Sequence, residues 1–305
     1  MVDMEKSITY LDIQRLSTED GPGLRTTVFF KGCPLSCSWC HNPESISPKP
    51  EIVCLEDRCM GCALCEAACS KKARRLSETN RELCGACGLC ADACPTAAIE
   101  LKGTSMSASA LARELLRDKA YWGAEGGVTL SGGEAASQRE GALELLRLLK
   151  QEDVHTALDT CGMVVWDALD ELRRYTDLIL YDLKLADPDQ HKQYTGLDNA
   201  VILSNARRLH DSGANIWIRT PIIPGATDAD ENIRGIGRFI RDYLQDIKRW
   251  ELCSFNNLCR DKYRRLGRIF DFAGSPLMEK SDMERLCDIA TGYFPHTIWT
   301  GGTKV

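Results

Sequence analysis

The chain has little of what membrane-spanning, secreted or nucleic-acid-binding proteins need. Among its 305 residues, no apolar run approaches the roughly 20 residues that cross a bilayer. The N-terminal stretch MVDMEKSITYLD lacks the apolar core of a secretion signal. A formal net charge of -6 provides no basic stripe for a nucleic-acid footprint. We therefore expect a cytoplasmic protein whose partners are neither membranes nor nucleic acids.

A reducing compartment also disfavours disulfides, yet the chain contains 16 cysteines. Twelve of them lie between Cys33 and Cys94. Hydrophobic residues make up 44% of the chain, which is enough for a globular core without help from cross-links. Cysteines gathered in this way indicate an inorganic cofactor rather than scattered core thiols.

The first group of cysteines lies in residues 32–41, GCPLSCSWCH, with the spacing C-x3-C-x2-C. Three thiolates on so short a loop can hold three irons of a cubane 4Fe–4S cluster, but they cannot complete a tetrahedral zinc site. One iron of such a cluster stays open for a substrate or cofactor. We therefore place the chemical centre, and the first set of metal ligands, on Cys33, Cys37 and Cys40.

Residues 54–100 form a distinct insert that contains an internal repeat. The pattern C-x2-C-x2-C-x3-C occurs twice, as in bacterial two-cluster ferredoxins, where the fourth cysteine of each half ligates the other cluster. Pro95 follows the second copy in the usual way, whereas Ser70 follows the first. The alternative is a pair of zinc knuckles, for which two separated pairs of ligands are more typical. The predicted 4Fe–4S ligand sets are Cys59, Cys62, Cys65 and Cys94, and Cys84, Cys87, Cys90 and Cys69.

The remaining cysteines are expected to be small, mostly buried thiols without a role. Cys54 is an exception, because it lies five residues before Cys59 and could substitute as a ligand. The cysteines outside the three ligand sets are Cys54, Cys161, Cys253, Cys259 and Cys287.

Around the insert, predicted strands and helices alternate. The strands are expected at residues 24–30, 128–131, 155–160, 178–184, 216–223 and 248–255. The helices are expected at residues 107–122, 140–151, 165–175, 200–212, 230–244 and 282–293. Such alternation predicts an α/β fold with a parallel sheet, and six units would curl into a partial (β/α)6 barrel. We expect the barrel in residues 1–53 and 101–305 and a ferredoxin-like insert in residues 54–100.

Polar side chains stand where the predicted strands end. A parallel α/β barrel binds its ligands at the carboxyl ends of its strands. The simpler interpretation is that the glycines form turns and the charges are solvated. The residues concerned are Gly132, Gly133, Glu134, Asp159, Thr160, Asp182, Lys184 and Arg219.

The C-x3-C-x2-C loop resembles that of the radical S-adenosylmethionine (SAM) enzymes. With the run STEDGPGLRTT at residues 17–27, the chain resembles the activating enzymes of glycyl radical enzymes, of the pyruvate formate-lyase activating type, from about Thr9 to Ile298. The resemblance implies a six-unit partial barrel in which the open iron chelates SAM. One-electron cleavage of SAM would give a 5′-deoxyadenosyl radical that takes a hydrogen from a backbone glycine of a partner enzyme. A low-potential donor such as flavodoxin or ferredoxin would supply the electron.

The resemblance also assigns roles to the strand-end residues. In SGGE (131–134), backbone carbonyls and Glu134 would receive the amino group of SAM, and Lys184, counted with the catalytic residues, would meet its carboxylate. Arg219 is a further anion-binding candidate near SAM or the substrate. Thr160 and its acidic neighbours resemble a polar cluster that can also hold a monovalent cation; these neighbours are Asp159 and Asp182.

The nucleoside side of SAM would meet residues near the cysteine loop. Trp39 could stack on adenine, and the backbone of Cys40 and His41 would pack beside it. Asn256 stands where the family often has a histidine; it can form a hydrogen bond but cannot donate a proton with a tunable pKa. Ala135 follows SGGE where the family usually has proline, and we expect little effect on SAM binding.

Two other functions fit parts of the pattern. A radical SAM enzyme with auxiliary clusters could act on a small molecule or a peptidyl side chain, although the DGPG run favours the activase. A ferredoxin-type electron carrier on a structural barrel would not need SGGE and YDLK at strand ends. The two extra clusters could form an electron relay or shape a docking surface.

Overall fold

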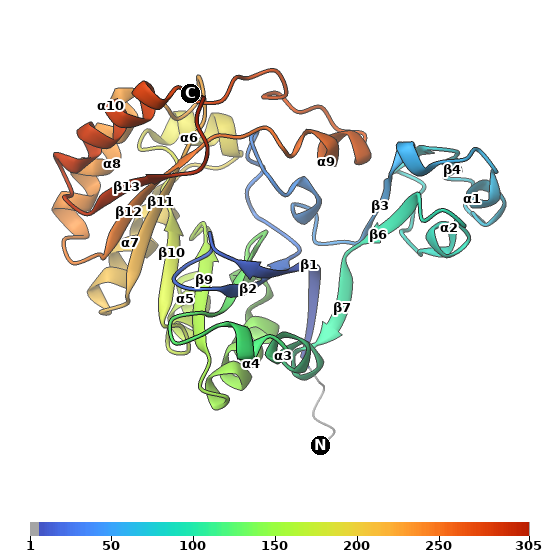
Figure 1. Ribbon diagram of the computed structural model, residues 1–305, viewed down its shortest axis with the longest axis horizontal. Coiled ribbons are helices and arrows are strands. Elements are labelled where there is room, and N and C mark those ends of the chain that lie inside the picture. The colour runs from blue at the N-terminus through green and yellow to red at the C-terminus, as the bar shows by residue number, and fades with distance from the viewer. Residues whose placement is uncertain (1–5, 305) are drawn as a thin grey trace.

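The computed structural model describes residues 6–304, and a nine-stranded sheet dominates it (Figure 1). The strand order is β13-β12-β11-β10-β9-β8-β2-β1-β7, so the sheet is open rather than closed into a full barrel. The parallel strands are β2 (Arg25–Phe30), β8 (Gly127–Gly132), β9 (His155–Thr160), β10 (Leu178–Asp182), β11 (Ile216–Ile222), β12 (Arg249–Ser254) and β13 (Thr297–Thr300). Antiparallel β1 (Ser7–Ser17) and β7 (Thr104–Ser107) extend one edge.

Helices pack on one face of the sheet (Figure 1), and a cavity opens on its other face, at the carboxyl ends of the strands. The helices outside the insert are α3 (Ala108–Leu116), α4 (Arg139–Gln151), α5 (Trp166–Arg173), α6 (Pro188–Thr195), α7 (Ala200–Asp211), α8 (Asp230–Tyr243), α9 (Arg260–Arg265) and α10 (Lys280–Thr291). Short 3-10 turns lie at Pro43–Ser45, Glu56–Arg58, Lys119–Tyr121 and Ala135–Gln138.

The sheet separates an apolar face from a polar one. In β11, Ile216, Ile218 and Ile222 are buried and alternate with half-buried Trp217 and Arg219. Because side chains alternate along a strand, the isoleucines pack into the core under the helices. Trp217 and Arg219 therefore face the opposite side of the sheet. The same alternation holds a row of polar groups inside the curved sheet.

All six predicted strands are present, each shifted by at most a few residues. The parallel sheet has one more member than expected, because β13 pairs with β12 at the far edge. Neither β13 nor α6 was predicted. β13 has only four residues, and α6 reads PDQHKQYT, which has no apolar stripe of helical period. Within residues 6–304, no helix is long and apolar enough to cross a membrane.

The cysteine-rich insert projects from the edge of the main body (Figure 1). Its stalk is an antiparallel pair formed by β3 (Glu51–Cys54) and β6 (Ile99–Lys102). Beyond the stalk lie α1 (Leu64–Ala67), α2 (Leu89–Asp92) and a small hairpin of β4 (Arg74–Arg75) with β5 (Glu78–Thr79).

The two halves of the insert repeat each other in structure as well as in sequence. The backbone N–H of Ala73 donates to Cys69 Sγ at 3.2 Å, and that of Ala98 donates to Cys94 Sγ at 3.2 Å. These bonds join equivalent positions of the repeat. Each half of the repeat therefore aims one backbone N–H donor at the sulfur of its fourth cysteine.

A carboxylate at the base of the insert links it to the main body. Glu51 forms ion pairs with Lys31 (3.2 Å), Arg81 (3.5 Å) and Arg268 (2.7 Å). Lys31 directly precedes the first cysteine loop, and Arg81 belongs to the insert and also donates to the carbonyl of Leu266 at 2.8 Å. One acidic side chain therefore ties the stalk to two separate parts of the barrel.

Candidate active site

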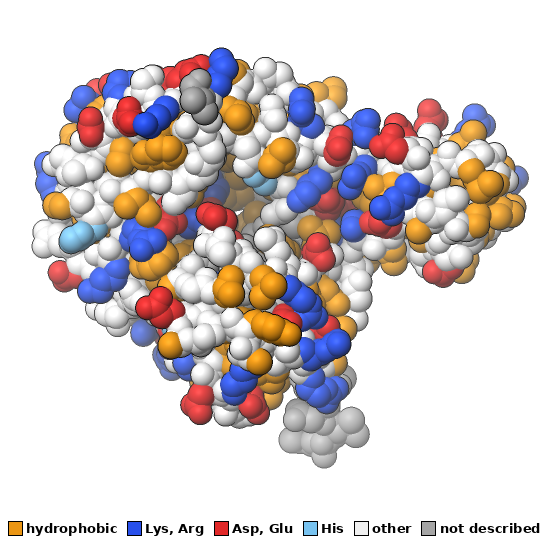
Figure 2. All heavy atoms as spheres, in the orientation of Figure 1, with side chains coloured by type: hydrophobic (Ala, Val, Ile, Leu, Met, Phe, Trp, Pro, Cys, Tyr) orange, Lys and Arg blue, Asp and Glu red, His pale blue; other side chains and the backbone are white. Residues whose placement is uncertain are grey.

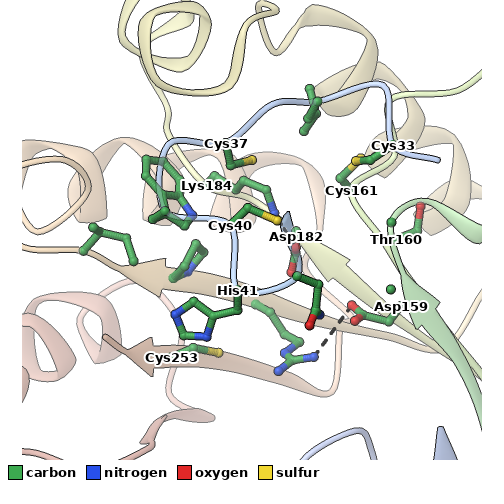
Figure 3. A pocket seen from close by; sticks show the side chains of 18 of the residues that line it. Cys33, Cys37, Cys40, His41, Asp159, Thr160, Cys161, Asp182, Lys184 and Cys253 are labelled. Carbon is green, nitrogen blue, oxygen red and sulfur yellow. Dashed lines mark hydrogen bonds and ion pairs between the residues drawn. The ribbon is translucent and has the colours of Figure 1, made fainter. Parts of the chain in front are cut away.

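The first cysteine loop crosses the carboxyl ends of the parallel strands and lines a cavity of about 260 Å³ (Figure 3). Strand β2 delivers the chain into this loop, and Gly32 turns it with a φ of 98°. The N–H of Cys33 then donates to the carbonyl of Ile46 at 3.0 Å. Cys33, Cys37 and Cys40 all line the cavity, so the structure brings together the ligand set predicted from spacing.

Helix α6 supports the loop from the outside. The backbone N–H of Ser36 donates to Thr195 at 2.8 Å, and that of Ser38 donates to Tyr194 at 2.9 Å. These bonds fix the backbone on both sides of Cys37. The Tyr194 ring also lies 5.8 Å from the ring of Trp39, another residue of the cavity wall.

The thiols of the loop are half-buried, and each has a pKa displaced from its ordinary value. Burial raises the pKa of Cys37 to about 11 and also raises the pKa of Cys40. The neighbouring Cys161 thiol lowers the pKa of Cys33. Burial alone would lower the pKa of Lys184, but the negative charges of Asp182 and Cys37 raise it, so the lysine stays cationic. These thiols beside a fixed cation fit an iron–sulfur core, whose irons compensate the thiolate charges.

A single metal ion and a cluster need different spacings of their ligands. Among residues 6–304, no group of three or more His, Cys, Asp or Glu side chains is gathered closely enough to hold a single ion. A cubane binds each thiolate through a different iron, so its ligands stand farther apart than those of one tetrahedral ion.

The two glycines of SGGE allow two strand ends to approach closely. Gly132 has a φ of 105°, and a Cβ there would collide with the backbone of Phe30. A Cβ on Gly133 would collide with the carbonyl of Gly32, at the start of the cysteine loop. Both glycines line the cavity. Their first role is therefore to pack β8 against the loop, which leaves backbone carbonyls at the cavity wall.

Glu134 departs from the expectation that its carboxylate faces the ligand. It is fully buried and does not line the cavity. Its carboxylate accepts hydrogen bonds from Thr160 Oγ1 at 2.8 Å and from the N–H groups of Cys161 at 2.9 Å and Ala136 at 3.1 Å. Burial raises the pKa of Glu134, although these hydrogen bonds act to lower it. Glu134 thus supports residues of the cavity wall from their buried side.

The acidic and basic strand-end residues face the cavity as expected (Figure 3). Ser131 donates to Asp159 at 2.6 Å, and Arg219 lies 3.7 Å from the same carboxylate. Asp182 forms an ion pair with Lys184. Burial, with Asp182 nearby, raises the pKa of Asp159 to about 6. The wall therefore offers two carboxylates and two cations to a zwitterionic ligand.

Two cysteines predicted to have no role line the cavity. Cys161 lies beside Cys33 and its thiol donates to Glu134 at 3.1 Å, while Cys253 lies beside Arg219 (Figure 3). The period of two along β12 could have found Cys253, because Glu251 faces the same side. The spacing of the cysteines does not predict that Cys161 lines the cavity, because its position depends on its contact with Glu134, which is distant in the sequence.

Of the residues expected near the nucleoside of SAM, some line the cavity and one does not. Trp39 and His41 line the cavity, and burial lowers the pKa of His41. Asn256 does not line it, because its side-chain oxygen accepts from the N–H of Leu258 at 3.2 Å and closes a turn.

The eight repeated cysteines of the insert border two separate cavities. Cys54 lines neither of them and packs in the small core between, with Ile52 and Ile99. The grouping is the one that the ferredoxin pattern predicts, with one cysteine exchanged between the halves. The first cavity is bordered by Cys59, Cys62, Cys65 and Cys94, and the second by Cys69, Cys84, Cys87 and Cys90.

Comparison with known proteins agrees with this geometry. The family model of the radical SAM superfamily matches residues 27–234. The chain is 35% identical over 294 residues to the choline trimethylamine-lyase activating enzyme of Oleidesulfovibrio alaskensis, covering 93% of this chain and 94% of that protein. It is 39% identical over 287 residues to the trans-4-hydroxy-L-proline dehydratase activating enzyme of Clostridioides difficile, covering 92% and 93%.

A third relative and a solved structure extend the comparison. The (2S)-3-sulfopropanediol dehydratase activating enzyme of Klebsiella oxytoca is 39% identical over 267 residues, which cover 84% of each chain. A radical SAM methyltransferase from Sphaerobacter thermophilus shares the fold, with a TM-score of 0.56 and 14% identity over 98% of this chain and 74% of that one. This chain therefore belongs to the radical SAM superfamily and, within it, to the activating enzymes of glycyl radical enzymes.

Proposed function

We propose that the cavity at the carboxyl ends of the strands binds a 4Fe–4S cluster through Cys33, Cys37 and Cys40 and binds SAM beside it. The observation that carries this proposal is the convergence of the three thiols with Gly132, Lys184 and other strand-end groups on one cavity. When bound, the reduced cluster supplies one electron to the sulfonium of SAM, and the resulting 5′-deoxyadenosyl radical takes a hydrogen atom from a backbone glycine of the partner enzyme.

The protein's part is to bind and orient SAM. Lys184, kept cationic by Asp182, and Arg219 provide the positive charges for its carboxylate. The carbonyls freed by the turn at Gly132 and Gly133 accept its ammonium. Trp39 and His41 provide the wall for adenine.

A monovalent cation would bind beside this wall. Asp159 and Asp182 face one cavity, and Asp182 is among the charges that raise the pKa of Asp159. Thr160 follows Asp159 in the chain and lines the same cavity. A cation placed there would relieve the repulsion between the two carboxylates.

The insert, residues 54–100, would hold two further clusters and the barrel would comprise residues 1–53 and 101–305. Support comes from the two cysteine-bordered cavities and from the matched N–H donors to Cys69 and Cys94. Three clusters in total would give the chain a route for electrons from a low-potential donor such as flavodoxin or ferredoxin.

The protein substrate is a glycyl radical enzyme. The relatives activate enzymes of different chemistry, namely a choline trimethylamine-lyase and two dehydratases. We propose that the partner of this chain belongs to the same group of lyases and dehydratases.

The origin of the abstracted hydrogen tests this proposal. Glycyl radical enzymes of the three kinds that the relatives activate would be labelled with α-deuterated glycine, mixed anaerobically with the loaded enzyme and SAM, and assayed by mass spectrometry. We expect deuterium in 5′-deoxyadenosine with at least one partner and an EPR signal of a glycyl radical on that partner. Unlabelled 5′-deoxyadenosine throughout, with turnover that rises on adding a small-molecule substrate instead, would contradict it.

A further inference from the structure

The two cysteine-bordered cavities of the insert differ in the charge around them. The first, with Cys59 and Cys94, is otherwise lined by uncharged side chains such as Met60 and Leu76. The second, with Cys69 and Cys84, is also lined by Lys71 and Arg74. The repeat is therefore symmetric in its sulfur ligands and asymmetric in its charge.

Arg74 brings a buried cation to the second cavity. Its exposed fraction is 3%, and it is held by the Thr79 hydroxyl and the Leu76 carbonyl. Its Nε has no hydrogen-bond partner among the described residues although it is buried. A buried, incompletely paired guanidinium beside four thiols favours added negative charge there. An electron is therefore accepted more readily in this cavity than in the uncharged one.

Two lysines extend the positive charge to the surface. Lys71 lines the second cavity with its ammonium beside Gly85, between Cys84 and Cys87 in the chain, and exposed Lys72 follows it. Neither lysine forms an ion pair with any residue from 6 to 304. By contrast, two arginines of the insert form ion pairs, Arg58 with Glu100 and Arg81 with Glu51. The lysines are thus free to meet an external anion.

Exposed apolar side chains lie close in the chain to the cysteines of this cavity, since Leu83 directly precedes Cys84 and Leu89 directly precedes Cys90. Leu83 and Leu89 are each 50% exposed, and Leu89 borders the same cavity. Figure 2 shows apolar and basic side chains next to each other on the projecting insert. Transient electron-transfer complexes bury little surface, under about 1,200 Å², and rely on a few charges to steer the encounter. A face of this composition suits such a complex.

We propose that the face formed by Lys71, Lys72, Leu83 and Leu89 is where electrons enter, and that it docks an acidic one-electron carrier protein of the ferredoxin type. One electron leaves the reduced carrier, which is oxidised, and reduces the cluster that Cys69, Cys84, Cys87 and Cys90 hold; no bond forms or breaks. The inference rests on the proposed function, because it needs the insert to hold clusters.

The test compares two charge-reversed variants. The first is Lys71→Glu with Lys72→Glu, and the control is Arg238→Glu with Lys248→Glu, two exposed residues of the barrel with the same change in charge. Binding of an acidic bacterial ferredoxin to the cluster-loaded proteins is measured by calorimetry at low and high salt. Iron content, and SAM cleavage driven by a chemical reductant, are measured in parallel.

We expect the lysine variant to bind ferredoxin about tenfold or more weakly at low salt and to lose most of the salt dependence, because rim charges steer such complexes. The control should bind like the wild type, and both should cleave SAM with the chemical reductant. Equal ferredoxin affinity and equal salt dependence in the two variants would overturn the docking face. Failure of the wild type to cleave SAM with the chemical reductant would instead overturn the proposed function.

Discussion

At the scale of single residues, Glu134 shapes the active site without facing it. Its carboxylate accepts from buried donors on Thr160, Cys161 and Ala136, of which Thr160 and Cys161 line the cavity. A buried acceptor of several donors is costly to remove, because each donor is then left without a partner. The residue that the family motif marks as a ligand is thus, in this structure, a support for the ligand site.

Replacing this carboxylate tests that role. Glu134→Ala should lower the free energy of unfolding by about 3 kcal/mol or more and should also weaken SAM binding. Glu231→Ala, at a helix surface where the side chain is 82% exposed, is the matched control and should change stability little. Thermal unfolding and equilibrium SAM binding measure the two effects. A Glu134→Ala protein as stable as the control would contradict the supporting role.

Asp159 predicts a pH-dependent response to monovalent cations. Burial raises its pKa to about 6, so the carboxylate is charged above that pH and neutral below it. Stimulation of SAM binding by sodium or potassium should therefore be full near pH 8 and disappear as the pH falls through about 6. Asp159→Asn should abolish the response at every pH, whereas exposed Asp246→Asn should keep it. A cation response that is unchanged at pH 5 would rule out this site.

At the scale of elements, the six central strands followed from alternation and β-branched residues, but the supports of the cysteine loop did not. Helix α6 lacks an apolar stripe because it packs through His191, Thr195 and its terminal carbonyls. Cys161 acquires its place from a contact with Cys33 that only the folded sheet creates. Local patterns predict strands and ligand spacing, whereas contacts between distant segments decide what stands behind a site.

The end of α6 can be tested with two glycines of similar backbone conformation. Gly196 has a φ of 90° and a Cβ there would lie 2.7 Å from Ser36 Oγ, whereas Gly213, after α7, has a φ of 74° and no described atom within 4 Å. Alanine at either position should cost roughly 1–2 kcal/mol of backbone strain. Only Gly196→Ala should also displace the loop, and so lower both iron content and SAM cleavage. Equal iron content and activity in the two variants would show that α6 does not position the loop.

At the scale of the whole molecule, a parallel sheet forms the proposed SAM site and a separate projecting insert carries the repeated cysteines (Figure 1). The exchange of the fourth cysteine between halves could be predicted from spacing, because the pattern constrains the fold of so short a segment. The unequal charge of the two cavities could not, since it depends on how Arg74 is buried. The projection itself depends on the contacts of Glu51 at the stalk.

Removing one predicted cluster ligand of the insert should show that the insert and the barrel have separate functions. Cys87→Ala should lower the iron content by up to about four atoms per chain, because it removes one ligand of a 4Fe–4S set. SAM cleavage with a chemical reductant should remain, while cleavage driven by a protein donor should fall. Full iron content in this variant, or loss of the chemically driven reaction, would contradict separate roles for barrel and insert.

The central claim is that Cys33, Cys37 and Cys40 hold the cluster that cleaves SAM in this cavity. Its most direct test is the formation of 5′-deoxyadenosine by anaerobically reconstituted enzyme with SAM and a strong chemical reductant. The wild type and Cys287→Ala, a substitution on α10 far from the cavity, should form it, and Cys37→Ala should form none. Formation by Cys37→Ala at the wild-type rate, or no formation by fully loaded wild type, would contradict the account.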